Sequence, residues 1–373
     1  MNNKKYSIFI TVLFCAFIFG FGIAHFVLPD RDFSEQENRY LSQFKAPTWD
    51  TLRSGKFMET FEDYITDQFP LRDSWIQLKS LSERILGKQE NNRVYFSKDG
   101  QTLFAQYTAP DDLATRVGYV NKLADNLDVP VYLSLVPDKS YVWADRLPAN
   151  APNVDDGWTK ETVKSLVRQR VNFVDLYSAL HGDDVFYRTD HHWTTMGAYQ
   201  GYTALANAMN CSATSLDDVP TPVSYEFYGT TWSSAGAGWV KPDTIHIMVP
   251  EGGINGQLLI YRYPEGEPIE GSLYDLSKLE VKDKYSMFLG GNQPLCVIYN
   301  PEGSGNLLVI RDSYSDSLAP FLSMDYQTVH LFDPRYNNWS LKQYVTTYNI
   351  DQVLVLYSAS NFATDVNLFK LAY

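Results

Sequence analysis

The sequence predicts an α/β protein with a mostly parallel sheet, preceded by one N-terminal transmembrane helix. Two observations support this prediction. Apolar, β-rich runs alternate with segments of helical periodicity, as in parallel sheets covered by helices. In addition, residues 6–28 contain no Asp, Glu, Lys or Arg, and no comparable run follows in the 373-residue chain. The remainder is long enough for one large domain with a substantial core.

The uncharged N-terminal run has the length of a membrane span. As a helix it would extend roughly 34 Å, enough for a bilayer core. Lys4 and Lys5 precede it and an acidic flank follows, which orients the remaining chain outward by the positive-inside rule. A cleavable signal peptide is the alternative, but the run is long and no clear small-x-small site follows it. We therefore expect a single-pass cell-membrane anchor at residues 1–28, with the remaining chain outside the cytoplasm.

The segment 29–90 is predicted to be a stalk followed by an amphipathic helix. Residues 33–56 carry Pro47, Gly55 and mixed charges and show no sustained period. Beyond them, Trp75, Leu78 and Ile85 fall on one helical stripe. We expect this helix to face the core.

Residues 91–373 carry the alternating pattern of the predicted α/β domain. Helical patterns lie at 113–123, 195–209 and 340–348. Residues 223–301 are rich in Gly, Ser and aromatics and are expected to form an insertion of loops and short strands. Sites in such sheets form beyond the carboxyl ends of the strands. The strand-like runs are Val129–Pro137, Val171–Leu176, Leu307–Ile310, Thr328–Phe332 and Gln352–Tyr357.

Composition limits the partners of this domain. A net charge of -13 and the lack of a basic cluster argue against nucleic acid. Neutral or already-anchored molecules are the expected partners. Cys211 and Cys296 could form a disulfide outside the cytoplasm, or could remain buried thiols. No Cys and His spacing suggests a zinc ribbon, and we expect no cofactor.

The strongest chemical motif is Asp190-His191-His192-Trp193, in a chain with only six histidines. Histidine is the usual general base near neutral pH, and a carboxylate can orient it. Asp190 and His192 stand two residues apart, so they share one face of an extended loop while His191 points away. His192 is therefore the candidate base and Asp190 its partner. A structural loop or a metal site are the alternatives, with His181, Asp183 and Asp184 as further nearby groups.

A candidate nucleophile follows the apolar run 307–310, in Arg311-Asp312-Ser313-Tyr314. A serine hydroxyl becomes nucleophilic only when an imidazole takes its proton, which requires Ser313 within about 3 Å of a histidine nitrogen. The alternative is an ordinary turn residue or helix cap. Ser315 and Ser317 are the competing serines nearby.

Further residues could contact substrate or stabilise an oxyanion. The backbone amide of Tyr314 follows the candidate nucleophile, and Asn292 lies in a Gly290-Gly291-Asn292 turn that could offer amide donors. Arg335 and Tyr336 follow a strand-like run, although exposed ion pairing is the commoner role of an arginine. Lys139 also follows such a run and either lines the pocket or is solvated.

The block Thr189-Asp190-His191-His192-Trp193-Thr194-Thr195, with Gly197 and Ala198 after it, resembles the signature of the DHHW family. That family is related to the SGNH-hydrolase-like proteins of alginate O-acetylation. Further blocks continue the resemblance in order through nearly the whole chain outside the anchor. They are Glu37-Asn38-Arg39, Val136-Pro137-Asp138-Lys139, Phe227-Tyr228-Gly229-Thr230, Gly290-Gly291-Asn292, Arg311-Asp312-Ser313-Tyr314-Ser315 and Asp333-Pro334-Arg335-Tyr336.

The resemblance implies an SGNH-hydrolase-like fold at residues 91–373, permuted because Asp190 and His192 precede Ser313. It implies that Ser313 accepts an acetyl group and passes it to a hydroxyl of an envelope polysaccharide. A membrane-bound O-acyltransferase would supply the acetyl group across the bilayer. Arg311 departs from the lysine expected before Asp312, which leaves the chemistry intact, and the identity of the glycan does not carry over.

Two other functions are compatible with the same sequence. An acetyl esterase would use the same residues to remove acetyl groups from envelope glycans. A non-catalytic glycan-binding or assembly factor of an exopolysaccharide export complex would not need the Ser313 hydroxyl.

Overall fold

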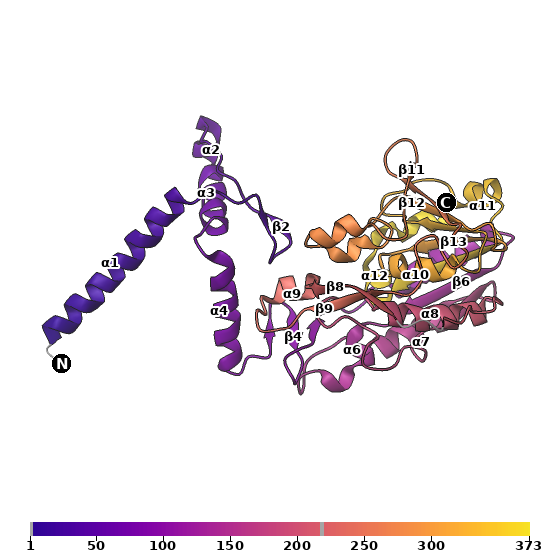
Figure 1. The fold of residues 1–373 in the computed structure, drawn as a ribbon, viewed down its shortest axis with the longest axis horizontal. Helices are drawn as coiled ribbons and strands as arrows, with labels where there is room; N and C mark the ends of the chain where they lie inside the picture. Colours follow the sequence, from indigo (N-terminus) through magenta and orange to yellow (C-terminus); the bar gives the residue numbers. More distant parts are fainter. Residues whose placement is uncertain (1–2, 217–219) are drawn as a thin grey trace. The chain divides into compact units, whose positions relative to one another are not determined.

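The computed structural model describes residues 3–216 and 220–373 of the chain (Figure 1). Its contacts form two compact units. The first comprises Met1–Asn91 with Ser233–Trp239, and the second comprises Asn92–Trp232 with Val240–Tyr373.

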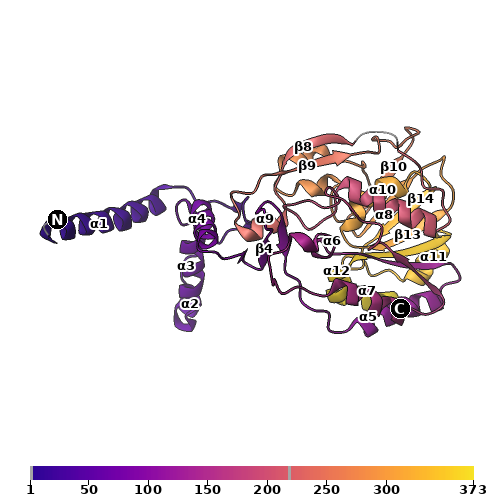
Figure 2. The same ribbon diagram turned by 90° about the horizontal axis from the view of Figure 1, so that it is seen from below.

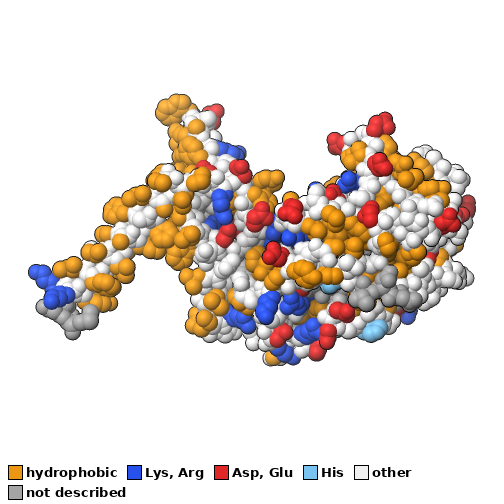
Figure 3. Space-filling view, viewed as in Figure 1, with side chains coloured by type: hydrophobic (Ala, Val, Ile, Leu, Met, Phe, Trp, Pro, Cys, Tyr) orange, Lys and Arg blue, Asp and Glu red, His pale blue; other side chains and the backbone are white. Residues whose placement is uncertain are grey.

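The first unit begins with the apolar helix α1 (Asn3–Val27). Within it, Lys4–Val27 is long and apolar enough to cross a membrane. Figure 3 shows apolar side chains along this helix. The prediction of one N-terminal apolar helix is therefore confirmed.

The segment after α1 contains more helix than its sequence pattern predicts. The predicted amphipathic helix is α4 (Arg72–Ile85), but α2 (Trp49–Ser54) and α3 (Lys56–Asp67) precede it. The expectation that its apolar stripe faces a core is wrong, because Trp75, Leu78 and Ile85 are exposed. A Thr48 capping box starts α2, and Gly55 at φ 78° separates the two helices. The six residues of α2 are too few to give a sustained period within residues 33–56, and α3 begins only at the last residue of that segment. The small strands of this unit are β1 (Phe33–Ser34), β2 (Arg39–Tyr40) and β3 (Glu90–Asn91).

The second unit is built on an eight-stranded sheet with the order β11-β10-β12-β14-β13-β15-β6-β7. The run from β14 to β7 is parallel throughout. These parallel strands coincide with the five predicted runs, so the predicted α/β fold with a mostly parallel sheet is confirmed. They are β6 (Val131–Val136), β7 (Val171–Asp175), β13 (Asn306–Arg311), β14 (Thr328–Phe332) and β15 (Gln352–Ser358).

The segment 223–301, expected as an insertion, supplies the antiparallel edge of the main sheet. Strand β12 (Leu295–Tyr299) pairs with β14, β10 (Leu259–Tyr263) pairs with β12, and β11 (Ile269–Glu270) completes the edge. The same segment also contributes to a separate hairpin of β8 (Thr221–Phe227) and β9 (Asp243–Ile247). Short antiparallel strands joined by loops show little of the alternation that marks the parallel half.

Helices cover both faces of the main sheet (Figure 2). Neighbouring β13 residues point to opposite faces, with Leu307 and Val309 in one apolar core and Leu308 and Ile310 in the other. Helices α8 (Thr195–Ala208) and α10 (Tyr314–Leu322) pack in the first core. The second core takes α5 (Leu113–Asn126), α7 (Asp156–Leu166), α11 (Leu341–Thr347) and α12 (Ala359–Thr364). The remaining elements of this unit are β4 (Val94–Phe96), β5 (Leu103–Ala105), α6 (Lys139–Val142), 3₁₀ turns at Ala144–Arg146, Leu276–Glu280, Lys284–Met287 and Val366–Ala372, and part of α9 (Thr230–Ala235).

Asp312 holds the carboxyl ends of two parallel strands together. Its Oδ2 accepts hydrogen bonds from the Ser358 amide (2.9 Å), the Ser358 hydroxyl (2.9 Å) and Asn361 Nδ2 (2.8 Å). Its Oδ1 accepts from the Tyr314 amide at 3.1 Å. The ends of β13 and β15 are thereby tied where the chain turns into α10, which fixes the position of Ser313.

The cysteines are free thiols in the structure. Cys296 lies buried in β12, and the Cys211 thiol is 3.1 Å from the Tyr326 hydroxyl. Cys211 and Cys296 are therefore two separate thiols in the structure and do not form a disulfide with each other.

His330 on β14 provides a pH test of this core. Burial lowers the pKa of this histidine to about 4, and its ring nitrogens lie 2.7 Å from the Tyr344 hydroxyl and 3.0 Å from the Thr328 hydroxyl. Because the unfolded ring protonates near pH 6.5, folding stability should fall as the pH drops from about 6.5 to about 4. The loss should be about 3 kcal/mol. Urea unfolding of the wild type and His330→Gln should converge at low pH, whereas parallel pH profiles would contradict this assignment.

Candidate active site

Ser313, His192 and Asp190 form a hydrogen-bonded chain of side chains. His192 Nε2 lies 2.8 Å from Ser313 Oγ, and His192 Nδ1 lies 2.6 Å from Asp190 Oδ1. The histidine and the aspartate are buried, and Ser313 is partly exposed. With Nδ1 donating to the carboxylate, Nε2 can accept the hydroxyl proton. This is the arrangement of a serine nucleophile, its base and the group that orients the base.

Both carboxylate oxygens of Asp190 accept hydrogen bonds. Oδ1 also accepts from the His192 amide at 3.0 Å, while Oδ2 accepts from the Thr230 amide at 2.7 Å and its hydroxyl at 2.9 Å. Burial by itself would raise the pKa of Asp190, but the neighbouring His191 and His192 and these hydrogen bonds hold that pKa well below its usual value. Asp190 is therefore ionised at neutral pH.

A glycine allows this approach between Asp190 and the 229–230 turn. A Cβ atom on Gly229 would lie 2.2 Å from the Asp190 Cβ, well inside van der Waals contact. Only glycine lets the backbone come this close. The block Phe227-Tyr228-Gly229-Thr230 thus supplies the groups that hold the carboxylate.

Asp243 on β9 holds the loop that carries Asp190, His191 and His192 by accepting hydrogen bonds from the two residues before Asp190. Its Oδ2 accepts from the Thr189 amide (2.7 Å) and hydroxyl (2.6 Å). Its Oδ1 accepts from the amide and Nε of Arg188, both at 3.1 Å. These bonds set the backbone immediately before Asp190.

Lys139 supports the same loop, which corrects the expectation that it lines the pocket or is solvated. Its buried ammonium donates to the carbonyl oxygens of Tyr187 (2.8 Å), Arg188 (3.3 Å) and Asp190 (2.7 Å). Burial lowers the pKa of Lys139 to about 7, while the charges of Asp243 and Asp190 oppose that shift. The sequence does not reveal this role, because the partners of the Lys139 ammonium are backbone carbonyls and not side chains.

Tyr285 packs against the candidate base and has no counterpart in the sequence analysis. Its ring stacks on His192 with centroids 3.8 Å apart and planes at 9°. Its hydroxyl donates to the Ser313 carbonyl at 3.1 Å and lies 3.0 Å from the Ser317 hydroxyl. One side chain therefore restrains both the imidazole and the turn of the nucleophile. Tyr285 lies in the short 3₁₀ turn Lys284–Met287, so no periodicity or motif marks it.

Trp193 and Tyr314 connect the histidine loop to α10. Trp193 Nε1 donates to the Tyr314 carbonyl (3.0 Å) and the Ser317 hydroxyl (2.9 Å). The Tyr314 hydroxyl donates to the His191 carbonyl at 2.6 Å. The nucleophile and its base, 121 residues apart in sequence, are thus held by reciprocal bonds.

Of the two expected oxyanion donors, the Tyr314 amide is already occupied and the Asn292 side-chain amide keeps its NH₂ group available. The Tyr314 amide, expected to serve this role, instead donates to Asp312 Oδ1, because that carboxylate closes the turn after β13. Asn292 Oδ1 accepts from Arg311 Nη1 at 3.0 Å and lies 3.5 Å from Arg335 Nη2. These contacts orient the Asn292 amide with its oxygen toward the arginines, so its NH₂ group faces the other way and can act as a donor.

Arg335 and Tyr336 lie on the loop after β14. Arg335 makes an ion pair with Asp333, at 2.6 Å between Nη2 and Oδ2. The Arg335 guanidinium also lies 5.4 Å from the ring centre of Tyr336, which is exposed. The structure therefore gives Arg335 mainly an ion-pairing role, and places Tyr336 at the surface of the same sheet edge.

Asp190, His191 and His192 also satisfy the spacing of a metal site, with one ligand atom each within 4.8 Å. However, the same atoms are engaged in hydrogen bonds with protein groups. His191 Nδ1 lies 2.8 Å from the Thr230 hydroxyl, and the His192 nitrogens contact Asp190 and Ser313. Burial lowers the pKa of His191 to about 4, so this ring is neutral at pH 7. The geometry fits the hydrogen-bonded triad better than a ligand set.

Replacing Tyr285 should separate ring stacking from hydrogen bonding. Tyr285→Leu removes the stacked ring, so we expect kcat for p-nitrophenyl acetate to fall about tenfold with little change in KM. Tyr285→Phe keeps the ring and should therefore keep more than half of the wild-type kcat. Equal losses in both variants would assign the effect to the hydroxyl and contradict the stacking role.

The comparisons with known proteins agree with the fold. Residues 163–332 match the family model described as DHHW protein. A DHHW family protein from Eubacterium siraeum matches with TM-score 0.64 and 20% identity over 75% of this chain and 95% of that one. Bacillus cereus PatB1 with a sulfonyl adduct matches with TM-score 0.62 and 19% identity, over 75% of this chain and 98% of that one. No curated protein matches by sequence.

The matched segment contains Asp190, His191, His192, Trp193 and Ser313. The two solved structures have under 25% identity to this chain and therefore establish the shared fold alone. The family model, which matches residues 163–332, confirms the resemblance to the DHHW family seen in the motifs.

Proposed function

We propose that this protein is an O-acetyltransferase that acetylates an envelope polysaccharide through an acetyl-serine intermediate on Ser313. The observation that carries the proposal is the hydrogen-bonded order Ser313, His192 and Asp190, with separations of 2.8 and 2.6 Å. The choice of an acetyl group as the transferred group and of a glycan as the acceptor is based on the resemblance to the DHHW family and its alginate-acetylation relatives.

In the first step, Ser313 Oγ attacks the acetyl carbonyl of the donor and His192 Nε2 takes the hydroxyl proton. Asp190 stabilises the resulting imidazolium. The tetrahedral intermediate collapses to acetyl-Ser313, and the leaving group departs with the proton from His192. The Ser313 amide and the Asn292 NH₂ group are the proposed oxyanion donors.

In the second step, a sugar hydroxyl attacks the acetyl-serine while His192 Nε2 accepts its proton. The C–O bond to Ser313 breaks, and the proton returns to Ser313 Oγ through His192. The product is an O-acetylated sugar and free enzyme. Water can replace the sugar, so transfer requires a bound acceptor and restricted solvent access.

We further propose that α1 anchors the protein in the cell membrane with the α/β unit outside the cytoplasm. Lys4 and Lys5 lie in the first turn of α1, ahead of its uncharged stretch, as the positive-inside rule requires for this orientation. A membrane-bound O-acyltransferase would then present the acetyl group on the same side.

The proposed mechanism predicts an adduct at Ser313. Incubating the detergent-solubilised chain with p-nitrophenyl acetate should add about 42 Da, located on Ser313 by peptide mass spectrometry. Ser313→Ala and His192→Ala should lose the adduct and lower turnover roughly 10³-fold. Ser315→Ala is the matched control, because this serine lies on the same turn but outside the triad, and it should keep the adduct.

The acceptor decides between the transferase and the two alternatives. Acetylated oligosaccharide formed faster than free acetate would support transfer, whereas acetate alone would make the protein an esterase. If Ser313→Ala retained both turnover and biological function, the non-catalytic binding or assembly factor would be favoured.

A further inference from the structure

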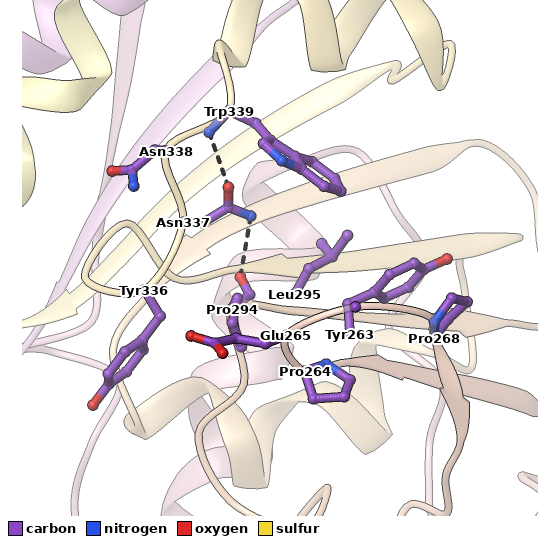
Figure 4. A pocket seen from close by; sticks show the side chains of 11 residues that line it. Tyr263, Pro264, Glu265, Pro268, Pro294, Leu295, Tyr336, Asn337, Asn338 and Trp339 are labelled. Carbon is purple, nitrogen blue, oxygen red and sulfur yellow. Dashed lines mark hydrogen bonds between the residues drawn. The ribbon is translucent and has the colours of Figure 1, made fainter.

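A pocket of about 430 Å³ opens at the edge of the main sheet that also carries Ser313. Its wall combines aromatic rings, prolines and a carboxylate. Figure 4 shows the rings of Trp339 and Tyr263 around Leu295, with Glu265 and Tyr336 toward the other end. Trp339 and Tyr336 are 51% and 56% exposed, so much of each aromatic surface is open to solvent.

Sheet topology places this pocket near the nucleophile. Tyr336 and Trp339 follow β14, which lies directly beside β13, the strand that leads to Ser313. Leu295 pairs with Phe332 at the end of β14, and Tyr263 pairs with Leu295. With about 4.8 Å between strands, the pocket begins one strand away from β13 and extends about 10 Å from β14 across β12 to β10.

A short chain of contacts connects the two regions. Arg311, the last residue of β13, donates to Asn292 Oδ1 at 3.0 Å, and Arg335 Nη2 lies 3.5 Å from the same oxygen. Arg335 is followed by Tyr336. The proposed oxyanion group and the pocket wall therefore belong to one connected surface.

The aromatic wall is held in place by the protein. The Trp339 ring stacks on Tyr344 with centroids 5.8 Å apart and planes at 27°, and the Trp339 amide donates to Asn337 Oδ1 at 2.9 Å. Lys370 Nζ donates to the Pro334 carbonyl at 2.5 Å and contacts the Asn337 carbonyl at 3.3 Å. The site is thus largely pre-formed, which reduces the entropy lost on binding.

The chemistry of the lining favours an uncharged sugar. Aromatic faces pack against apolar C–H surfaces, while Asn338, the Tyr336 hydroxyl and Glu265 can hydrogen-bond to ring hydroxyls. Among the described residues that line the pocket, Glu265 supplies a carboxylate and none is Lys or Arg. A uronic acid at this position would meet an acidic group without a lining cation to pair with it.

We propose that this pocket binds an uncharged sugar residue of the acceptor polysaccharide, distinct from the residue whose hydroxyl receives the acetyl group. This inference rests on the proposed function and assigns part of its specificity. The pocket would hold the chain against the sheet edge, so that an acceptor hydroxyl reaches acetyl-Ser313 in preference to water.

Calorimetric titration of the full chain with cellotetraose, chitotetraose and tetragalacturonate tests the proposal. At least one neutral tetrasaccharide should bind, and Trp339→Ala and Tyr336→Ala should each weaken its Kd about tenfold. Trp158→Ala is the matched control, because this tryptophan is 53% exposed on α7, away from the pocket, and it should leave the Kd unchanged. Glu265→Gln should strengthen tetragalacturonate binding while neutral binding stays within about twofold.

Failure of this inference can be distinguished from failure of the proposed function. Ser313→Ala should lower ester turnover roughly 10³-fold yet keep the tetrasaccharide Kd. Unchanged turnover in this variant would contradict the triad and leave the pocket proposal standing. The pocket proposal would be overturned if the Kd stayed unchanged in both aromatic variants, or if neither neutral tetrasaccharide bound. Preferential binding of a polyproline peptide, another ligand of aromatic pockets, would also overturn it.

Discussion

The hydrogen bond between His192 Nδ1 and Asp190 Oδ1 is the interaction on which the candidate site depends. It fixes the tautomer that leaves Nε2 free to accept the Ser313 proton, and its 2.6 Å length joins two buried groups. A buried carboxylate is costly unless every oxygen is paired, and here Thr230 occupies the second oxygen. Much of the surrounding structure serves to keep this one carboxylate charged and in place.

The fold supplies that support from distant parts of the sequence. Lys139 follows β6 and binds the carbonyls of the histidine loop, while Asp243 of β9 binds its amides. Trp193 and Tyr314 then join this loop to the turn after β13. The carboxyl edge of the parallel sheet is therefore where the loop and the nucleophile meet, as expected for an open α/β sheet.

The parallel half of the sheet was predictable because its strands are buried on both faces and read as continuous apolar runs. The triad was also accessible, since Asp190 and His192 lie two residues apart and Ser313 ends such a run. Tyr285 was not, because a stacking partner in a single 3₁₀ turn leaves no periodic pattern in the sequence. Lys139 was misplaced for a related reason: its partners are backbone carbonyls, which any sequence provides. The Tyr314 amide is not free for an oxyanion, because it donates to Asp312 Oδ1. That bond depends on the three-dimensional shape of the turn and leaves no mark in the sequence.

The most direct test of this account is the site and rate of covalent modification by phenylmethylsulfonyl fluoride, a reagent that reacts with activated serine hydroxyls. If His192 activates Ser313, the wild type should be sulfonylated at Ser313 alone among its serines. The rate should fall by roughly two or more orders of magnitude in His192→Ala and in Asp190→Ala. Equal modification of wild type and His192→Ala, or modification at another serine, would contradict the central claim.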